Sequence, residues 1–172
     1  MQKFIRIFGA IALTGLCVWG WFTFFPSPEK AIRSRLNKLA ETISFEPQSG
    51  VISRAYQTEK AAAFFTTEAE VQVEVRGMDP QHLGGRDEIQ QALLLANRSL
   101  RGFKVQFLDI NVTLGADQQT AKANLTGKWT IGNSRDFDVL EFNFLLRKVD
   151  GVWLIYRVES VKTLSLKTSP TA

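Results

Sequence analysis

One carboxylate and the only histidine of the chain lie close enough in sequence to suggest chemistry. His82 follows Asp79 by three residues in a predicted loop over 77–85. A carboxylate and an imidazole within reach of each other could form an acid–base pair, because imidazole titrates near neutral pH. The alternative, which we favour, is that Asp79-Pro80 starts a turn and His82 is a solvated loop residue. The sequence therefore assigns no catalytic residue.

Other motifs with a known chemical mechanism do not occur with a recognisable context. We find no Walker loop, dinucleotide fingerprint, HExxH pair or Ser-His-Asp arrangement. The one cysteine, Cys17, lies in an uncharged segment, so neither an intrachain disulfide nor a cysteine metal cluster can form. The sequence predicts no metal site and no cofactor.

The uncharged segment itself is the clearest signal of location. Residues 7–25 are nineteen residues without a charge, and as a helix they would span about 28 Å, close to the hydrocarbon core of a bilayer. A cleaved signal peptide is the alternative, but the bulky run from Trp19 to Phe25 offers no pair of small residues at the last and third-last positions before a cut. We predict a short tail (1–6), a transmembrane anchor (7–25), a linker (26–27), one domain (28–166) and a flexible tail (167–172).

Charge bears on orientation and on partners. Basic residues lie on both sides of the anchor, so the positive-inside rule does not decide which side holds the domain. From the short basic tail we predict a single-pass inner (plasma) membrane protein with a periplasmic or other extracytoplasmic domain. Of 21 Lys and Arg residues, Lys3 and Arg6 precede the anchor. The remaining 19 basic residues are nearly balanced by 17 acidic residues. This balance favours an ordinary mixed surface over a nucleic-acid partner.

Periodicity predicts the elements of the domain. Apolar residues at helical spacing indicate helices over 28–44 and 52–65 and a third opening at Asp87 and Glu88. The first helix has an apolar stripe of Ile32, Leu36, Leu39 and Ile43, and the third has one of Ile89, Leu93, Ala96 and Leu100. Alternation indicates a strand over 69–76, and four more strands follow at 103–114, 120–131, 136–149 and 152–164. The apolar phase changes within two of these strands, which predicts β-bulges near 107–108 and 139–140.

Two stretches carry a resemblance to a known superfamily. The second helix runs through Ala61-Ala62-Ala63-Phe64-Phe65 into the first strand, and Gly85-Arg86-Asp87-Glu88-Ile89 opens the third helix. With the element order, this chain resembles the nuclear transport factor 2-like, or cystatin-like α+β cone, superfamily, and especially its SnoaL-like branch. The resemblance covers about residues 28–164.

The resemblance implies a fold class and sets limits on chemistry. It implies an α+β domain after the anchor: a cone of three helices packed on a strongly curved, mostly antiparallel sheet, often dimeric through that sheet and often with a pocket in the cone. Ketosteroid isomerase-like members use a tyrosine from the first helix. That helix has no tyrosine in this chain, and Tyr56 of the second helix is only a weak substitute.

The last two strands suggest a partner. In the predicted last strand, Val152, Leu154 and Tyr156 lie on one face, and Trp153 and Ile155 lie on the other. A strand in a sheet with one solvent-exposed face should alternate apolar and polar residues. Apolar residues on both faces therefore indicate that both faces of the sheet are covered. A second copy or a protein partner would cover the outer face, with candidates Leu145, Trp153 and Ile155. Alternatively, these are central strands covered by the chain's own helices and tail.

Two functions follow from this pattern. The first, which we favour, is a membrane-anchored binding or assembly module that presents the cone domain outside the cytoplasm. The alternative is a small-molecule isomerase, cyclase or dehydratase of the SnoaL or ketosteroid isomerase type, acting on a small apolar ligand by acid–base chemistry. The enzyme requires an inward-facing ionisable residue in a closed apolar cavity. A cone filled by Phe, Trp and Leu side chains would argue against it.

Overall fold

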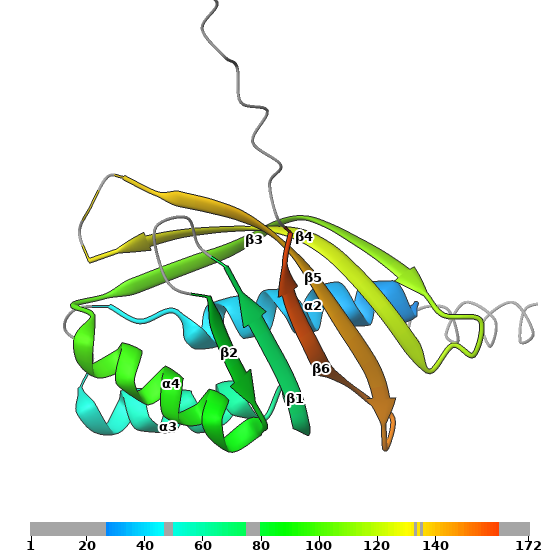
Figure 1. Cartoon of the computed structure of the whole chain (residues 1–172), viewed down its shortest axis with the longest axis horizontal. Coiled ribbons are helices and arrows are strands. Elements are labelled where there is room, and N and C mark those ends of the chain that lie inside the picture. Colours follow the sequence, from blue (N-terminus) through cyan, green and yellow to red (C-terminus); the bar gives the residue numbers. More distant parts are fainter. Residues whose placement is uncertain (1–26, 47–49, 75–79, 133, 135, 162–172) are drawn as a thin grey trace, which may run out of the picture.

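A computed structural model describes residues 27–46, 50–74, 80–132, 134 and 136–161. The elements run helix, helix, strand, strand, helix and then four strands, and Figure 1 shows a curved sheet with helices beneath it. In chain order they are α2 (Pro28–Ile43), α3 (Val51–Ala62), β1 (Phe65–Val73), β2 (Gln81–Gly84), α4 (Arg86–Ser99), β3 (Phe103–Leu114), β4 (Thr120–Ile131), β5 (Asp138–Val149) and β6 (Val152–Ser160).

Helix α2 forms where the apolar stripe predicted it. Pro28 suits the first turn because it has no amide hydrogen to leave unpaired, and the Ser27 hydroxyl accepts a hydrogen bond from the Lys30 amide at 3.4 Å. The stripe faces inward, with Ile32, Leu36 and Leu39 all buried. The predicted helix is confirmed to within one residue at its C-terminal end.

Helix α3 is shorter than predicted. It ends at Ala62, where Ala63 caps it, and Phe65 already belongs to β1. The prediction that the helix reaches residue 65 is wrong, because Phe64 and Phe65 look equally apolar in a helix and in a buried strand. Strand β1 consequently starts four residues before its predicted first residue, 69.

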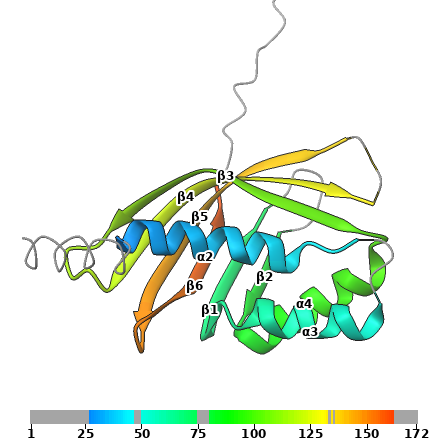
Figure 2. The same cartoon turned by 180° about the vertical axis from the view of Figure 1, so that it is seen from behind.

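The sheet has the strand order β2-β1-β6-β5-β4-β3. Strand β1 runs parallel to β6, and all other neighbours are antiparallel. Helix α2 packs across one face of this sheet, and α3 and α4 lie side by side, as both views show (Figures 1 and 2). The predicted α+β fold with three helices on a curved, mostly antiparallel sheet is confirmed.

Strand β2 is an element that the sequence did not predict. Residues 81–84 fall in the predicted loop, yet they pair antiparallel with β1, from Gly84 opposite Glu70 to Gln81 opposite Val73. Four residues are too few to show a period-2 pattern, and two of them, Leu83 and Gly84, carry no strand signal of their own. Gly85 then adopts φ +86° and begins α4.

One predicted bulge is confirmed and the other is wrong. The β3–β4 register shifts between Leu108 and Asn111, where Asp109 adopts φ +52°. In contrast, the β4–β5 register runs without a shift from Asp138 to Arg147. The predicted bulge near 139–140 rested on the parity of Phe137 and Val139; Phe137 lies outside the strand, and Val139 is an exposed residue of the strand. A bulge that was not predicted lies in β6 at Tyr156, between the pairs Leu146–Ile155 and Leu145–Arg157.

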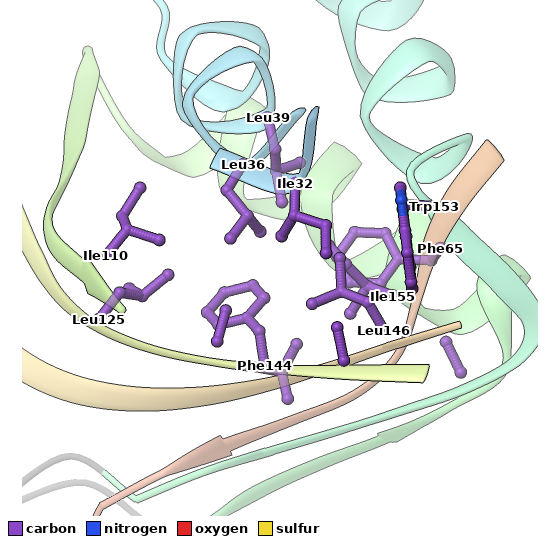
Figure 3. Packing of buried hydrophobic residues seen from close by; sticks show 14 of the residues in the cluster. Ile32, Leu36, Leu39, Phe65, Ile110, Leu125, Phe144, Leu146, Trp153 and Ile155 are labelled. Carbon is purple, nitrogen blue, oxygen red and sulfur yellow. The ribbon is translucent and has the colours of Figure 1, made fainter. Parts of the chain in front are cut away.

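The space between α2 and the sheet is the hydrophobic core. Figure 3 shows Ile32, Leu36 and Leu39 of α2 above Phe144 and Leu146 of β5. Phe65 of β1, Trp153 and Ile155 of β6, Ile110 of β3 and Leu125 of β4 complete the labelled set. Burial of this apolar surface is the main favourable term that holds helix to sheet.

Among the described residues, no helix is long and apolar enough to cross a membrane. The predicted anchor at 7–25 and the predicted tail at 167–172 lie outside the described residues.

Candidate functional site

The interior of the cone is packed with apolar side chains. The ring of Phe144 meets that of Phe107 edge to face at 5.5 Å and lies 6.1 Å from that of Phe142. Within the described part of the chain, the buried polar residues are Thr58 and Thr66, and neither is ionisable. The buried side chains of the described residues therefore include no acid or base.

The predicted catalytic candidates do not converge. Tyr56 is 58% exposed on α3, with the Lys60 ammonium 4.3 Å from its ring centroid. His82 is exposed on the edge strand β2, opposite Gln72 of β1. Asp79 lies outside the described residues, so the predicted Asp79–His82 pair stays a prediction. Neither Tyr56 nor His82 lines the three hollows described below.

A hollow of about 290 Å³ lies between the helices rather than inside the cone. We call it the helix-side cavity, and its lining comes from α2 and the residues after it, α3, α4 and the first residue of β3. The lining residues are Thr42, Ile43, Phe45, Gln57, Thr58, Ala61, Leu93, Ala96, Asn97, Leu100 and Phe103. No residue of β4, β5 or β6 is among them, so the cavity lies at the helix side of the packed interior, which it borders through Ala61.

One wall of the helix-side cavity carries a buried polar pair. Thr58 is 1% exposed, and its hydroxyl donates to the Arg54 carbonyl at 2.9 Å and accepts from Asn97 Nδ2 at 2.7 Å. The Arg54 guanidinium donates in turn to the Asn97 carbonyl at 2.9 Å, which ties α3 to α4. The side-chain oxygen of Asn97 is buried and has no hydrogen-bond partner in the described structure.

No sequence pattern indicates this polar wall. The predicted apolar stripe of the third helix does line the cavity through Leu93, Ala96 and Leu100. Thr58 and Asn97, however, stand 39 residues apart, and each looks like an ordinary polar position of an amphipathic helix. Only the packing of α3 on α4 brings the two side chains together, and periodicity says nothing about which helices become neighbours.

A second hollow of about 480 Å³ adjoins the first. The two share Phe45, Gln57 and Phe103, and the second also includes the charged residues Glu41, Glu46 and Lys104. The rings of Phe45 and Phe103 lie 6.3 Å apart at 36°. An apolar chamber thus adjoins a more polar one beside the C-terminal end of α2.

The sheet face opposite the helices is polar. The registers align one residue from every strand into a single row across the sheet. This polar row is Asn111, Asn124, Asn143, Glu159, Gln72 and His82. Within it, Asn124 Nδ2 donates to Asn143 Oδ1. A hollow of about 320 Å³ on this face includes Asn111 and Asn124 together with Asp109 and Glu141.

Ion pairs flank the polar row. Arg157 of β6 contacts Glu70 of β1 at 2.6 Å and Glu159 at 3.8 Å, and Arg147 pairs with Glu68. The hydrogen bond to Glu70 and its negative charge raise the pKa of Arg157. No group of three or more His, Cys, Asp or Glu side chains with metal-binding geometry occurs among the described residues.

The predicted interface residues divide between the two faces. Leu145 lies half-buried on the outer face, in the parity of Asn143 and Arg147. Trp153 and Ile155 are only 5% and 1% exposed and belong to the core beneath α2. This corrects their assignment to a partner interface, because the chain's own helices cover that parity. The outer positions of β6 are Leu154 and, beyond the bulge at Tyr156, Arg157 and Glu159.

Comparisons with known proteins establish the fold. No family model and no curated protein matches the sequence. Solved structures with a cystatin-like fold do match. A domain of unknown function from Nostoc punctiforme aligns at 18% identity with a TM-score of 0.62, over 83% of this chain and 81% of that one. A nuclear transport factor 2-like protein of unknown function from Pseudomonas putida aligns at 10% identity with a TM-score of 0.62, over 81% and 89%.

A third similar structure comes from Novosphingobium aromaticivorans and is a proposed scytalone dehydratase. It aligns at 19% identity with a TM-score of 0.59, over 78% of this chain and 83% of that one. Together these structures show that residues after the N-terminal segment adopt the nuclear transport factor 2-like, cystatin-like fold that the sequence predicted. At these identities the likeness concerns the fold, which hosts many unrelated functions.

Proposed function

We propose that this protein is a membrane-anchored binding or assembly module rather than an acid–base enzyme of the cone. The packed interior is the observation that carries the proposal. Phe144, Leu146 and Trp153 are buried in the core inside the cone, beneath α2. An acid–base mechanism needs an ionisable group within hydrogen-bond reach of a bound substrate, and the buried side chains among the described residues include none.

The outer face of the sheet is the surface we propose for assembly. It carries the polar row and the ion pairs of Arg147 and Arg157, and among them lie the half-buried apolar residues Leu145 and Leu154. Polar side chains around a small apolar centre are the usual anatomy of a protein interface. Tethering through residues 7–25 would hold this face near partners in or at the membrane.

The test is a matched pair of charge substitutions in the full-length chain. Leu145→Arg places a charge at the centre of the outer face, and Leu95→Arg makes the same change on α4, where Leu95 is 62% exposed. We expect the native chain and Leu95→Arg in mild detergent to form the same chemically cross-linked complex, with a second copy or a protein partner. Leu145→Arg should lose it, with thermal unfolding measured for all three to show that each is folded.

Two results would overturn the proposal. One is a native chain that is recovered alone and as a monomer by cross-linking at native expression level. The other is a complex that survives Leu145→Arg unchanged, which would exclude the outer face as the point of assembly.

A further inference from the structure

The helix-side cavity is independent of the proposed assembly face, because its lining residues come from the opposite side of the sheet. We propose that it is a binding site for a small neutral molecule of one or two rings that carries a single hydroxyl or N–H donor. The polar wall formed by Thr58 and Asn97 and the apolar lining of the rest of the cavity carry this proposal.

The apolar lining defines the body of the ligand. Ile43, Ala61, Leu93 and Leu100 supply aliphatic surface, and Phe45 and Phe103 supply two aromatic rings. A volume of about 290 Å³ is near the lower end of the range for small-molecule pockets. Such a chamber suits a compact ring system better than a long chain.

The polar wall indicates that the ligand carries one hydrogen-bond donor. Asn97 Oδ1 is buried without a partner, although an amide oxygen can accept two hydrogen bonds. A buried acceptor that is left unpaired is destabilising, so a donor brought by a ligand would be favoured there. The oxygen is buried away from the cavity surface, so a ligand donor reaches it only when the Asn97 side chain turns. This turn exchanges the hydrogen bond from Asn97 Nδ2 to the Thr58 hydroxyl for one to the ligand, and the Thr58 hydroxyl keeps its bond to the Arg54 carbonyl.

The absence of charge in the lining defines the ligand as neutral. None of the eleven lining residues has an ionisable side chain. An ion buried in such a chamber would lose its hydration and gain no counter-charge from the described lining residues, and the adjoining Arg54 guanidinium already donates to the Asn97 carbonyl. The cavity shares Phe45 and Gln57 with the adjoining hollow, which also includes the charged residues Glu41, Glu46 and Lys104. A polar substituent of the ligand could therefore extend from the cavity into that hollow.

The experiment uses 2-naphthol as the probe and the full-length chain in detergent micelles, with titration into empty micelles subtracted. Ala96→Trp fills the cavity, and Leu95→Trp places the same side chain on the exposed side of α4. By isothermal titration calorimetry we expect saturable binding of one 2-naphthol to the native chain and to Leu95→Trp. Affinity should fall at least ten-fold in Ala96→Trp. Equal affinities of the native chain and Ala96→Trp, or no saturable binding to the native chain, would overturn the proposal.

Methyl NMR locates the probe if Ala96→Trp does not fold. The methyl signals of Ile43 and Leu93, which line the cavity, should shift when 2-naphthol is added, and those of Ile32 and Leu36 in the core should shift less. The reverse pattern would refute the site.

The donor is tested with 2-methoxynaphthalene, which cannot donate a hydrogen bond. It should bind the native chain several-fold more weakly than 2-naphthol, and Asn97→Leu should abolish this difference; equal affinities for the native chain would refute the role of Asn97.

Discussion

A glycine in the centre of β4 shows how a single residue limits the packing of the core. A Cβ atom at Gly127 would lie 2.8 Å and 3.1 Å from Cε2 and Cδ2 of the Phe142 ring. That ring packs in turn against Phe144, so it cannot move without disturbing the interior. Gly127 is thus needed for close approach, and its backbone does not adopt a positive φ.

We therefore expect Gly127→Ala to lower the free energy of unfolding by about 1–3 kcal/mol, the usual cost of overpacking. The midpoint of urea unfolding, followed by circular dichroism, measures this change. Gly50→Ser is the control, because Gly50 has open space around it and precedes α3 as its N-cap, where serine is favoured. A Gly127→Ala midpoint equal to that of the control would contradict this account of the packing.

At the residue level, the sequence predicts the inward residues of a helix but not which face of a doubly apolar strand lies in the core. Ile32, Leu36 and Leu39 were predicted as one stripe and are all buried. Trp153 and Ile155 were assigned to a partner, because apolar residues on both parities of β6 look alike in sequence. The bulge at Tyr156 accounts only for the residues after it, since it moves the inward parity from Ile155 to Val158, whereas Leu154 before it is an apolar residue on the outer face. A bulge has no fixed sequence signature, and it therefore escaped prediction there.

Among the elements, the start of α4 is tied to the start of β1 by one side chain. Arg86, the arginine of the Gly85-Arg86-Asp87-Glu88-Ile89 motif, donates from Nε at 3.0 Å and from Nη2 at 2.5 Å to the Phe65 carbonyl. The motif residue on which the family resemblance partly rested thus makes a structural contact in this chain. It fixes the helix against the strand that follows α3.

Loss of this contact should destabilise the domain. We expect Arg86→Ala to lower the free energy of unfolding by about 1.5–3 kcal/mol, as for other hydrogen bonds from a charged donor. Arg86→Lys should restore only part of it, since an ammonium cannot donate through two fixed nitrogens. Urea unfolding tests both, with the exposed Arg101→Ala as the control. Equal stability of the Arg86→Ala and Arg101→Ala variants would show that the contact is dispensable.

Element types were more predictable than their limits. The strands β3 and β4 match their predicted ranges, because long alternating runs flanked by turn residues leave little choice. The junction of α3 and β1 was misplaced, because Phe64 and Phe65 satisfy both patterns. The helix-side cavity could not be predicted at all, since it depends on how three helices pack at the edge of the sheet.

At the scale of the whole molecule, the proposed function joins a packed domain to a predicted anchor. The chain between Phe25 and the first residue of α2 is only two residues long. If residues 7–25 cross the bilayer, α2 begins within a few ångströms of the membrane surface, because two residues span at most about 7 Å. The domain would then be held at the surface instead of sampling a large volume on a flexible linker.

The anchor is tested by a charge at its centre. Leu16→Arg introduces an arginine midway along 7–25, which costs about 2.5–3.5 kcal/mol for insertion at the helix centre. We expect the native chain to stay in the membrane pellet after an alkaline carbonate wash, and a large fraction of Leu16→Arg to appear in the supernatant. Leu95→Arg, with the same substitution on the exposed side of α4, should remain in the pellet. Release of the native chain by carbonate would remove the tether from the proposed function, while the packed interior and the outer face would still argue for a binding module.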